Sequence, residues 1–316
     1  MKKADIGVAA YVVAAFVMMI VPIPNVLLDV LLACNIAIAF TILFGTMFSK
    51  EVLDMSFYPT MLLFTTVFRI ALNVSSTRLI LTTGDPGQVV ETFGSYVGGG
   101  NLVVGVIVFI ILILVQFMVI NKGSERVAEV TARFTLDAMP GKQMAIDADL
   151  NTGAITDAEA KMRRDKIQDE ANFFGSMDGA VKYVKGDATA GLVITAVNIV
   201  GGIAMGVLSQ GMDISAALNK YVILTIGDGL VSQIPSLLIS LSTGILVTKG
   251  SKDADFGTVL VSQLFGIPKV LYIVGFIIAA LGVVTPLPDI IFIALGLVYI
   301  VTGRMIAGTI ETAQIE

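Results

Sequence analysis

Four ionisable residues lie inside or beside long apolar runs, where a charged side chain is costly. Arg69 and Arg78 share one apolar run. Asp228 lies in a second, and Asp187 directly precedes a third. Charged side chains in such places usually face protein or water and mark ion or proton pathways. We therefore predict an ion-coupling site that contains all four residues. The alternative is a static ion pair that only joins helices.

The depth of each charge indicates its partner. At a rise of about 1.5 Å per residue, Arg78 and Asp228 come to similar heights in the membrane, so we predict that they form an ion pair. Arg69 lies near the middle of its run, and we predict that it faces three polar side chains: Asn73, Thr77 and Asn198.

A stripe of small side chains follows Asp228 along its run. Every fourth residue is small, and the first three are serines: Ser232, Ser236 and Ser240. Such a stripe lets helices pack closely, and it can equally line a hydrated path for an ion. Together with Asn73 and Asn198, these serines are the predicted path-lining residues.

A second charged cluster precedes the apolar run that begins at residue 188. Lys182 and Lys185 lie close before Asp187 in the sequence. A carboxylate there can accept a proton or pair with an ammonium group, and exchange between these states changes the local charge by one unit. We predict that this cluster links ion binding to movement of the adjoining loop. The alternative is a set of anchors whose long side chains reach water at the membrane surface.

Composition places these charges in a membrane protein. The 316 residues are 56% hydrophobic and only 14% charged, whereas soluble proteins are about 25% charged. There is no histidine and a single cysteine, Cys34, so a disulfide framework is excluded and the usual metal ligand is missing. The sequence also lacks a GK[ST] phosphate loop and the HExxH, GxSxG and CxxC motifs. We predict no enzyme activity, no resident metal or cofactor, and no nucleic-acid partner.

The apolar runs are long enough to cross a bilayer, which takes about 20 residues. We predict an all-α membrane protein with eight transmembrane helices and a helix-rich cytoplasmic insert between the fourth and the fifth. The helices are expected near 6–21, 26–48, 58–81, 101–121, 188–208, 221–248, 268–285 and 288–304. The corresponding domains are 1–121 (helices 1–4), 122–186 (insert), 187–306 (helices 5–8) and 307–316 (start of a linker).

Basic residues indicate the orientation of the chain. Ten of its 20 Lys and Arg lie in the insert, and loops rich in Lys and Arg stay in the cytoplasm. We therefore predict that both termini and the insert are cytoplasmic. Over 122–187, twelve acidic residues outnumber ten basic ones. This net charge of −2 favours contact with protein over contact with anionic lipid, and the alternative is a merely solvated loop.

The insert carries the most specific motif in the chain. Residues 126–144 read RVAEVTARFTLDAMPGKQM and residues 146–151 read IDADLN. With KGD at 185–187, LTIGDG at 224–229 and FRIALNVSSTR at 68–78, the chain resembles the FHIPEP family of type III secretion export gates over nearly its whole length. The sequence at 146–151 is more similar to the flagellar branch than to the injectisome branch. The signature residues are Arg126, Glu129, Arg133, Asp137, Lys142, Asp147 and Asp149.

The resemblance implies a multi-pass protein of the bacterial inner membrane that forms a ring, nonameric in the family, in the flagellar basal body. It implies coupling of protons, or of sodium, to export of flagellar proteins. The implied partners are the other export-gate membrane proteins and the MS ring. Family members carry a C-terminal domain after this region. That domain implies two further partners, the export ATPase complex and chaperone–substrate complexes. Because this sequence stops at Glu316, we expect it to be the membrane part alone.

The resemblance also assigns functional charges, and it leaves rival functions open. The implied charges are Arg69, Arg78, Lys182, Asp187 and Asp228, with Asp29 and Asp137 as weaker matches. A secondary transporter for a small solute often shows inverted repeats, and the two halves of this chain show none. A purely structural ring would conduct no ions, and an injectisome gate would use the same chemistry for other exported proteins.

Overall fold

The computed structural model describes residues 3–98, 101–249, 256–285 and 288–313, and it contains helices but no strands within these ranges. The chain divides into two compact units, Met1–Ser251 and Lys252–Glu316. The two ends of the chain, residues 1–2 and 314–316, lie outside the described residues.

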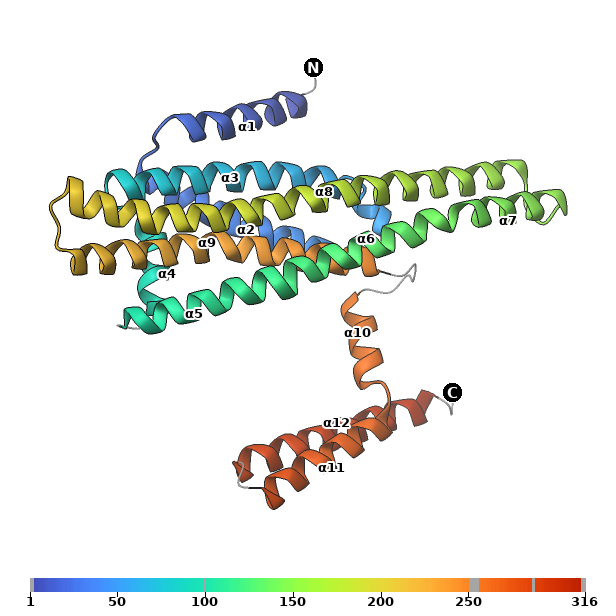
Figure 1. Cartoon of the computed structure of the whole chain (residues 1–316). Coiled ribbons are helices and arrows are strands. Elements are labelled where there is room, and N and C mark those ends of the chain that lie inside the picture. The colour runs from blue at the N-terminus through green and yellow to red at the C-terminus, as the bar shows by residue number, and fades with distance from the viewer. Residues whose placement is uncertain (1–2, 99–100, 250–255, 286–287, 314–316) are drawn as a thin grey trace. The chain divides into compact units, whose positions relative to one another are not determined.

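Long helices build the first unit, and several of them lie side by side (Figure 1). In chain order they are α1 (Lys3–Ile20), α2 (Asn25–Phe48), η1 (Val52–Met55), α3 (Tyr58–Thr82), α4 (Gln88–Gly98), α5 (Leu102–Val115), η2 (Gln116–Asn121), α6 (Lys122–Asp137), α7 (Met139–Asn151), α8 (Asp157–Ala204), η3 (Met205–Ser209) and α9 (Ile214–Thr248).

Helix α9 lies at the centre of this unit. It packs against α2, α3, α4, α5, α6 and α8. Its buried face combines large apolar side chains such as Tyr221 and Ile239 with small polar ones such as Ser236. Polar residues on α9 therefore face other helices, and this placement positions the candidate site.

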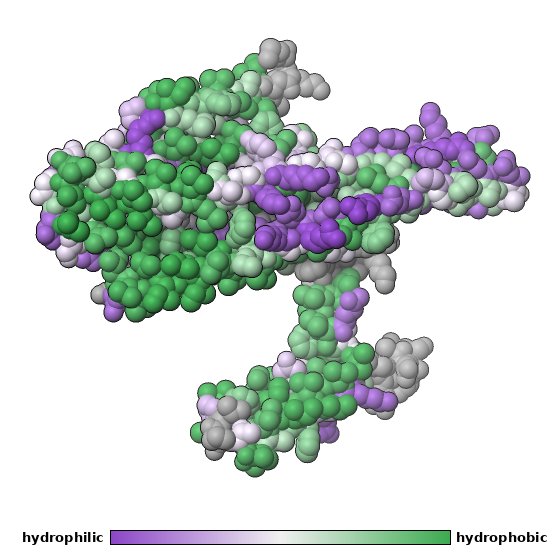
Figure 2. Space-filling view, viewed as in Figure 1, coloured by the Kyte–Doolittle hydropathy of each residue, from purple (hydrophilic) through white to green (hydrophobic). Residues whose placement is uncertain are grey.

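The predicted insert and the neighbouring spans form continuous helices. Helix α8 runs unbroken through its 48 residues, starting where Thr156 accepts a hydrogen bond from the backbone N–H of Glu159. On the other side, α5, η2 and α6 follow one another without a gap. The predicted domain boundaries at 121/122 and 186/187 thus fall within continuous helical segments. Figure 2 shows hydrophilic side chains gathered over α7 and the beginning of α8, beyond the apolar part of this unit.

The described residues of the second unit form three helices: α10 (Phe256–Phe265), α11 (Pro268–Val284) and α12 (Asp289–Ala313). Helices α11 and α12 pack closely, because a Cβ added at Gly296 would lie 2.6 Å from the carbonyl oxygen of Gly275. Helix α12 continues beyond residue 304, where we predicted that the last span ends, and it includes most of the predicted linker at 307–316.

The expected count of eight spans is not confirmed. Among the described residues, six helices are long and apolar enough to cross a membrane. A seventh span is present if α10 and α11, which are bent by 62°, are counted together. All eight predicted segments are helical, but Ile6–Ile20 is one of the shorter apolar helices. The pattern of apolar residues indicated helices correctly, whereas length decides which of them can span a membrane.

Helix α4 was not predicted, because its sequence lies between two glycine-rich stretches that indicate a loop. The Asp29 carboxylate of α2 accepts hydrogen bonds from the backbone N–H groups of Gln88 (2.9 Å) and Val89 (3.0 Å). A carboxylate at this position satisfies donors that the first turn of a helix leaves unpaired. Asp29 therefore anchors α4 to α2.

Substituting alanine at Gly227 is expected to lower the free energy of unfolding by about 1–3 kcal/mol, the usual cost of overpacking. A Cβ there would lie 1.9 Å from the carbonyl oxygen of Val90 and 2.9 Å from the backbone nitrogen of Gly94. The matched control is Gly244→Ala on the same helix, where a Cβ meets nothing within 4 Å. The control should stabilise the helix by about 0.5–1 kcal/mol. Denaturant unfolding in detergent, followed by circular dichroism, measures both; equal effects would contradict the close α4–α9 contact.

Candidate functional site

A buried ion pair joins α3 to α8. The Nη2 atom of Arg69 lies 2.8 Å from the Oδ2 atom of Asp187, and the two side chains are only 4% and 2% exposed. Among the described residues, neither oxygen of Asp187 has a hydrogen-bond partner, and neither do Nε and Nη1 of Arg69. Charge attraction rather than an aligned hydrogen bond therefore holds the pair, and several polar atoms stay available to another ligand.

This ion pair borders a cavity of about 60 Å³. One buried water needs roughly 10–15 Å³ measured in this way, so the cavity has room for several waters. The Oγ atom of Ser236 is buried and also lacks a hydrogen-bond partner among the described residues. The polar side chains that line the cavity are Arg69, Asn73, Gln116, Asn121, Asp187, Thr195, Asp228, Ser232, Gln233 and Ser236.

Asp228 lies at the same cavity without an arginine partner in the described part of the chain. Its Oδ1 atom accepts a short hydrogen bond from the hydroxyl of Ser76, and its Oδ2 atom accepts one of 3.1 Å from the amide of Asn198. All three side chains belong to different helices. The site thus contains two buried carboxylates, of which only Asp187 is charge-paired.

The predicted pair between Arg78 and Asp228 is wrong. Arg78 instead donates hydrogen bonds to the backbone carbonyls of Met19 (2.6 Å) and Ile20 (2.8 Å) at the end of α1. Nine residues separate Arg69 from Arg78, which is about two and a half turns of helix. The two guanidinium groups therefore leave α3 on opposite faces, so matching their depth to that of Asp228 could not identify the right partner.

The predicted contact between Arg69 and Asn198 is also wrong. Asn198 bonds Asp228, while Arg69 reaches Asp187. Asp187 directly precedes a predicted span, but α8 is unbroken there and packs against α3. Asn73 does line the cavity together with Arg69, whereas the hydroxyl of Thr77 is buried without a hydrogen-bond partner among the described residues.

The three serines of the stripe line the two cavities. Ser232 donates a hydrogen bond of 2.6 Å to Asn73, and both Ser232 and Ser236 line the main cavity. Ser240 lines a second, smaller cavity. Asn198 borders neither cavity and reaches the site only through Asp228.

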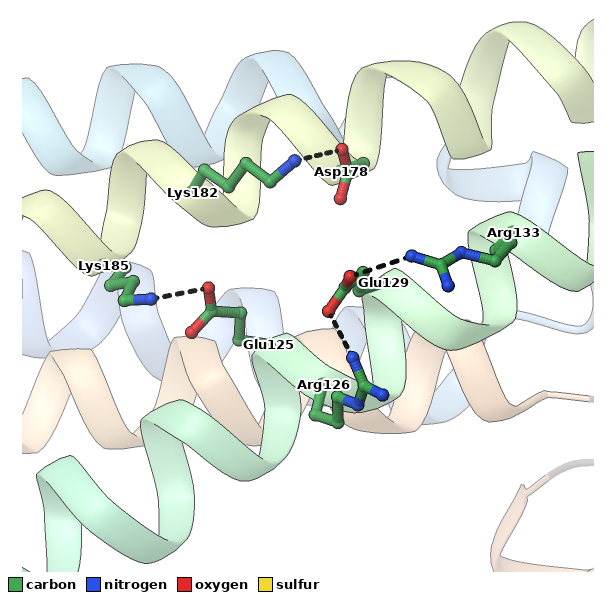
Figure 3. A network of polar contacts seen from close by, with 7 residues as sticks. All are labelled: Glu125, Arg126, Glu129, Arg133, Asp178, Lys182 and Lys185. Carbon is green, nitrogen blue, oxygen red and sulfur yellow. Dashed lines mark hydrogen bonds and ion pairs between the residues drawn. The ribbon is translucent and has the colours of Figure 1, made fainter.

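The structure does not bring Lys182 or Lys185 to Asp187. Lys182 bonds Asp178 (2.7 Å), and this hydrogen bond raises the pKa of the lysine ammonium. Lys185 bonds Glu125 of α6 (2.9 Å), as Figure 3 shows. Both lysines are largely exposed, whereas Asp187 is buried. The predicted switch cluster fails because side chains close in a helical sequence point in different directions.

Sequence reasoning missed five polar residues of the site: Ser76, Gln116, Asn121, Thr195 and Gln233. The signal was present for two of them, because Gln116 and Asn121 interrupt the otherwise apolar stretch at 102–121. The structure places both at the cavity, and Gln116 donates a hydrogen bond of 3.3 Å to the backbone carbonyl of Gln233.

Comparison with known proteins identifies the family. The sequence model of the FHIPEP family matches residues 15–315. The chain belongs to the FHIPEP family.

Several known proteins are similar in sequence to most of this chain. The flagellar biosynthesis protein FlhA of Bacillus subtilis is 53% identical over 91% of this chain and 42% of the relative. FlhA of Salmonella typhimurium is 50% identical over 91% of this chain and 43% of the relative. The low calcium response locus protein D of Yersinia pestis is 47% identical over 97% of this chain and 44% of the relative. The chain therefore spans less than half the length of these relatives. No solved structure matches it.

The FHIPEP motif at 126–144 covers α6 and the beginning of α7. On α6, Glu129 forms ion pairs with Arg126 (3.0 Å) and Arg133 (3.2 Å), which Figure 3 shows. Asp137 ends α6 and is exposed. All three side chains of these ion pairs belong to α6, and exposed ion pairs within one helix are worth little stability.

Ion pairs also connect α7 to α8. They join Lys142 to Glu170 (2.7 Å), Asp147 to Arg164 (2.5 Å) and Asp149 to Arg163 (3.4 Å). Three of the predicted signature residues thus contact α8, which is the helix that carries Asp187.

Proposed function

We propose that this chain is the membrane part of a flagellar type III protein export gate and couples ion movement to export. The family and the names of two relatives support the flagellar assignment. We assign no covalent chemistry to it. The coupling ion is a proton or sodium, and the gate is a ring of copies in the bacterial inner membrane with the insert in the cytoplasm.

One observation carries the ion-coupling proposal: a buried Arg69–Asp187 pair beside a polar cavity that also holds Asp228. Buried charges are costly, and a hydrophobic pair of similar size is often at least as stable. Ionisable residues within apolar helices usually mark ion or proton pathways. The incomplete hydrogen bonding of Asp187 leaves its oxygens able to accept a proton or a cation.

Helix α8 offers a physical link between this site and the insert. An ion that neutralises Asp187 would weaken its attraction to Arg69 and so favour a different packing of α8 on α3. Because α8 is a single helix from Asp157 to Ala204, a shift at Asp187 would also move its other end, to which α7 is bonded. The partners expected from the family, other gate proteins and the MS ring, would contact these outer surfaces.

An injectisome gate is the second candidate. The Yersinia pestis relative covers a larger share of this chain than either FlhA protein, at slightly lower identity. The same buried pair would serve either gate, so only the exported proteins would differ.

A chimera tests the proposed function in cells. We would join this chain to the part of Bacillus subtilis FlhA that follows the matched region and produce it in cells that lack their own FlhA. Swimming is expected to return with the unaltered chimera and to be lost with Asp228→Asn, which keeps the shape of the side chain but removes its charge. The matched control is Asp165→Asn, an exposed carboxylate of the insert, which should swim.

Each outcome has a defined meaning when the amount of membrane-inserted chimera is equal. If no chimera restores swimming although the protein is present, the flagellar assignment is contradicted. If Asp228→Asn swims as well as the unaltered chimera, the charge of Asp228 is not part of the coupling.

A further inference from the structure

We propose that Asn121 and Ser240 form a constriction on a water route that connects the buried cavity to the insert side of the protein, where the Glu125–Lys185 ion pair closes it. The inference rests on the proposed function, since it gives the coupling ion its way to Asp187. It gives roles to Asn121 and Glu125, to which the proposed function assigns none.

Two cavities meet at Asn121. The main cavity of about 60 Å³ contains Asp187 and Asp228, and the smaller one of about 20 Å³ is lined by Ser124, Glu125, Lys185 and Ser240. Asn121 borders both. The smaller cavity has room for at least one water, which needs roughly 10–15 Å³. The two spaces therefore adjoin at Asn121, and polar side chains line part of each.

A local change of helix type turns Asn121 towards the cavity. The segment Gln116–Asn121 is a π-helix between α5 and α6. In an α-helix, residues five apart point in clearly different directions, whereas the i→i+5 bonding of a π-helix brings them onto one face. Gln116 and Asn121 accordingly both line the main cavity. Such π-turns are frequent at functional sites.

A hydrogen bond spans the constriction. The hydroxyl of Ser240 donates to the Oδ1 atom of Asn121 at 3.0 Å. Both groups can bond water equally well, because water-mediated hydrogen bonds are nearly as favourable as direct ones. Exchange of this bond for bonds to water would open the route at little cost, which an apolar constriction would not allow.

Glu125 and Lys185 both line the smaller cavity, and Figure 3 shows the ion pair between them. Their charged atoms are 2.9 Å apart, and the side chains are 21% and 49% exposed. The pair links α6 to α8, the helix that carries Asp187. The same movement of α8 that the proposed function requires would therefore separate this pair and open the route.

Reaction of silver ions with introduced cysteines tests the route without relying on ion transport. In a Cys34→Ala background, which removes the chain's one cysteine, we would introduce Ser236→Cys in the main cavity and Ser240→Cys at the constriction. Ala71→Cys on α3, a fully buried position that lines neither cavity, is the control. Silver is added to vesicles in which the insert faces outwards, and the remaining thiol is counted with a fluorescent maleimide after denaturation.

Ser236→Cys and Ser240→Cys are expected to react, and Ala71→Cys is expected to remain unreacted. Adding Asn121→Leu should slow the reaction of Ser236→Cys about tenfold, which corresponds to about 1.4 kcal/mol in the barrier, and should leave Ser240→Cys unchanged. Lys185→Gln should speed both reactions. Asn121→Met replaces Asn121→Leu if the leucine variant does not fold.

The route is contradicted if neither substitution at Asn121 slows Ser236→Cys, or if Ala71→Cys reacts equally fast. This failure is distinct from failure of the proposed function. Silver could reach Ser236→Cys in a protein that moves no ions, which would support the route and contradict the coupling. If ion transport depends on Asp187 but substitution of Asn121 does not slow the silver reaction, the coupling is supported and the route is contradicted.

Discussion

Replacement of Asp187 by leucine is expected to lower the free energy of unfolding by about 3–5 kcal/mol, because it leaves the buried Arg69 without a counter-charge. Arg69→Met should cost a similar amount for the reciprocal reason. The double substitution should cost clearly less than either single one, since an apolar pair of similar volume replaces the ion pair. Denaturant unfolding of the four proteins in detergent, followed by circular dichroism, measures the cycle.

An exposed ion pair on the same helix provides the control for this cycle. Lys182 and Asp178 are 2.7 Å apart, close to the 2.8 Å of the buried pair, but their side chains are 62% and 35% exposed. Substituting Lys182→Met, Asp178→Leu or both should therefore leave stability almost unchanged. If the effects at Arg69 and Asp187 simply add, the two side chains do not interact and the geometry of the site is contradicted.

Helix positions could largely be predicted from the sequence, and side-chain partners could not. The apolar runs indicated every long helix, and three of the predicted charges, Arg69, Asp187 and Asp228, line one cavity. Partners depend on which face of a helix a residue occupies and on which neighbour covers that face. The depth of a residue in the membrane gives neither its helix face nor its neighbour. We therefore paired Asp228 with Arg78, which lies on the opposite face of α3 from Arg69.

The continuity of the helices was also not predictable from local sequence patterns. A change from polar to apolar composition near residue 187 suggested a boundary, but both compositions are compatible with one helix, α8. The same is true around residue 121, where a π-turn joins α5 to α6. Polar residues at these junctions, Asn121 and Asp187, face the interior because the helices continue through them.

Neutralising Asp187 without changing its shape is expected to abolish ion movement through this protein. Asparagine has nearly the same volume as aspartate, but its amide neither takes up a proton near neutral pH nor offers a negative charge to a cation. Arg69 would then lose its ion-pair partner, and the cavity would lose one of its two carboxylates. Ion flux into vesicles that contain Asp187→Asn should fall to the level of protein-free vesicles.

The most direct measurement records ion flux into sealed vesicles of defined lipid composition. A proton gradient is imposed on vesicles that contain a pH-sensitive dye, and a sodium gradient on vesicles that contain a sodium-sensitive dye. The unaltered chain and Asp165→Asn, an exposed carboxylate on the same helix, should dissipate one of these gradients, while Asp187→Asn should not. Equal flux through the unaltered chain and Asp187→Asn would contradict ion coupling at the buried pair. An unaltered chain that behaves like empty vesicles would contradict it as well and would favour a purely structural ring.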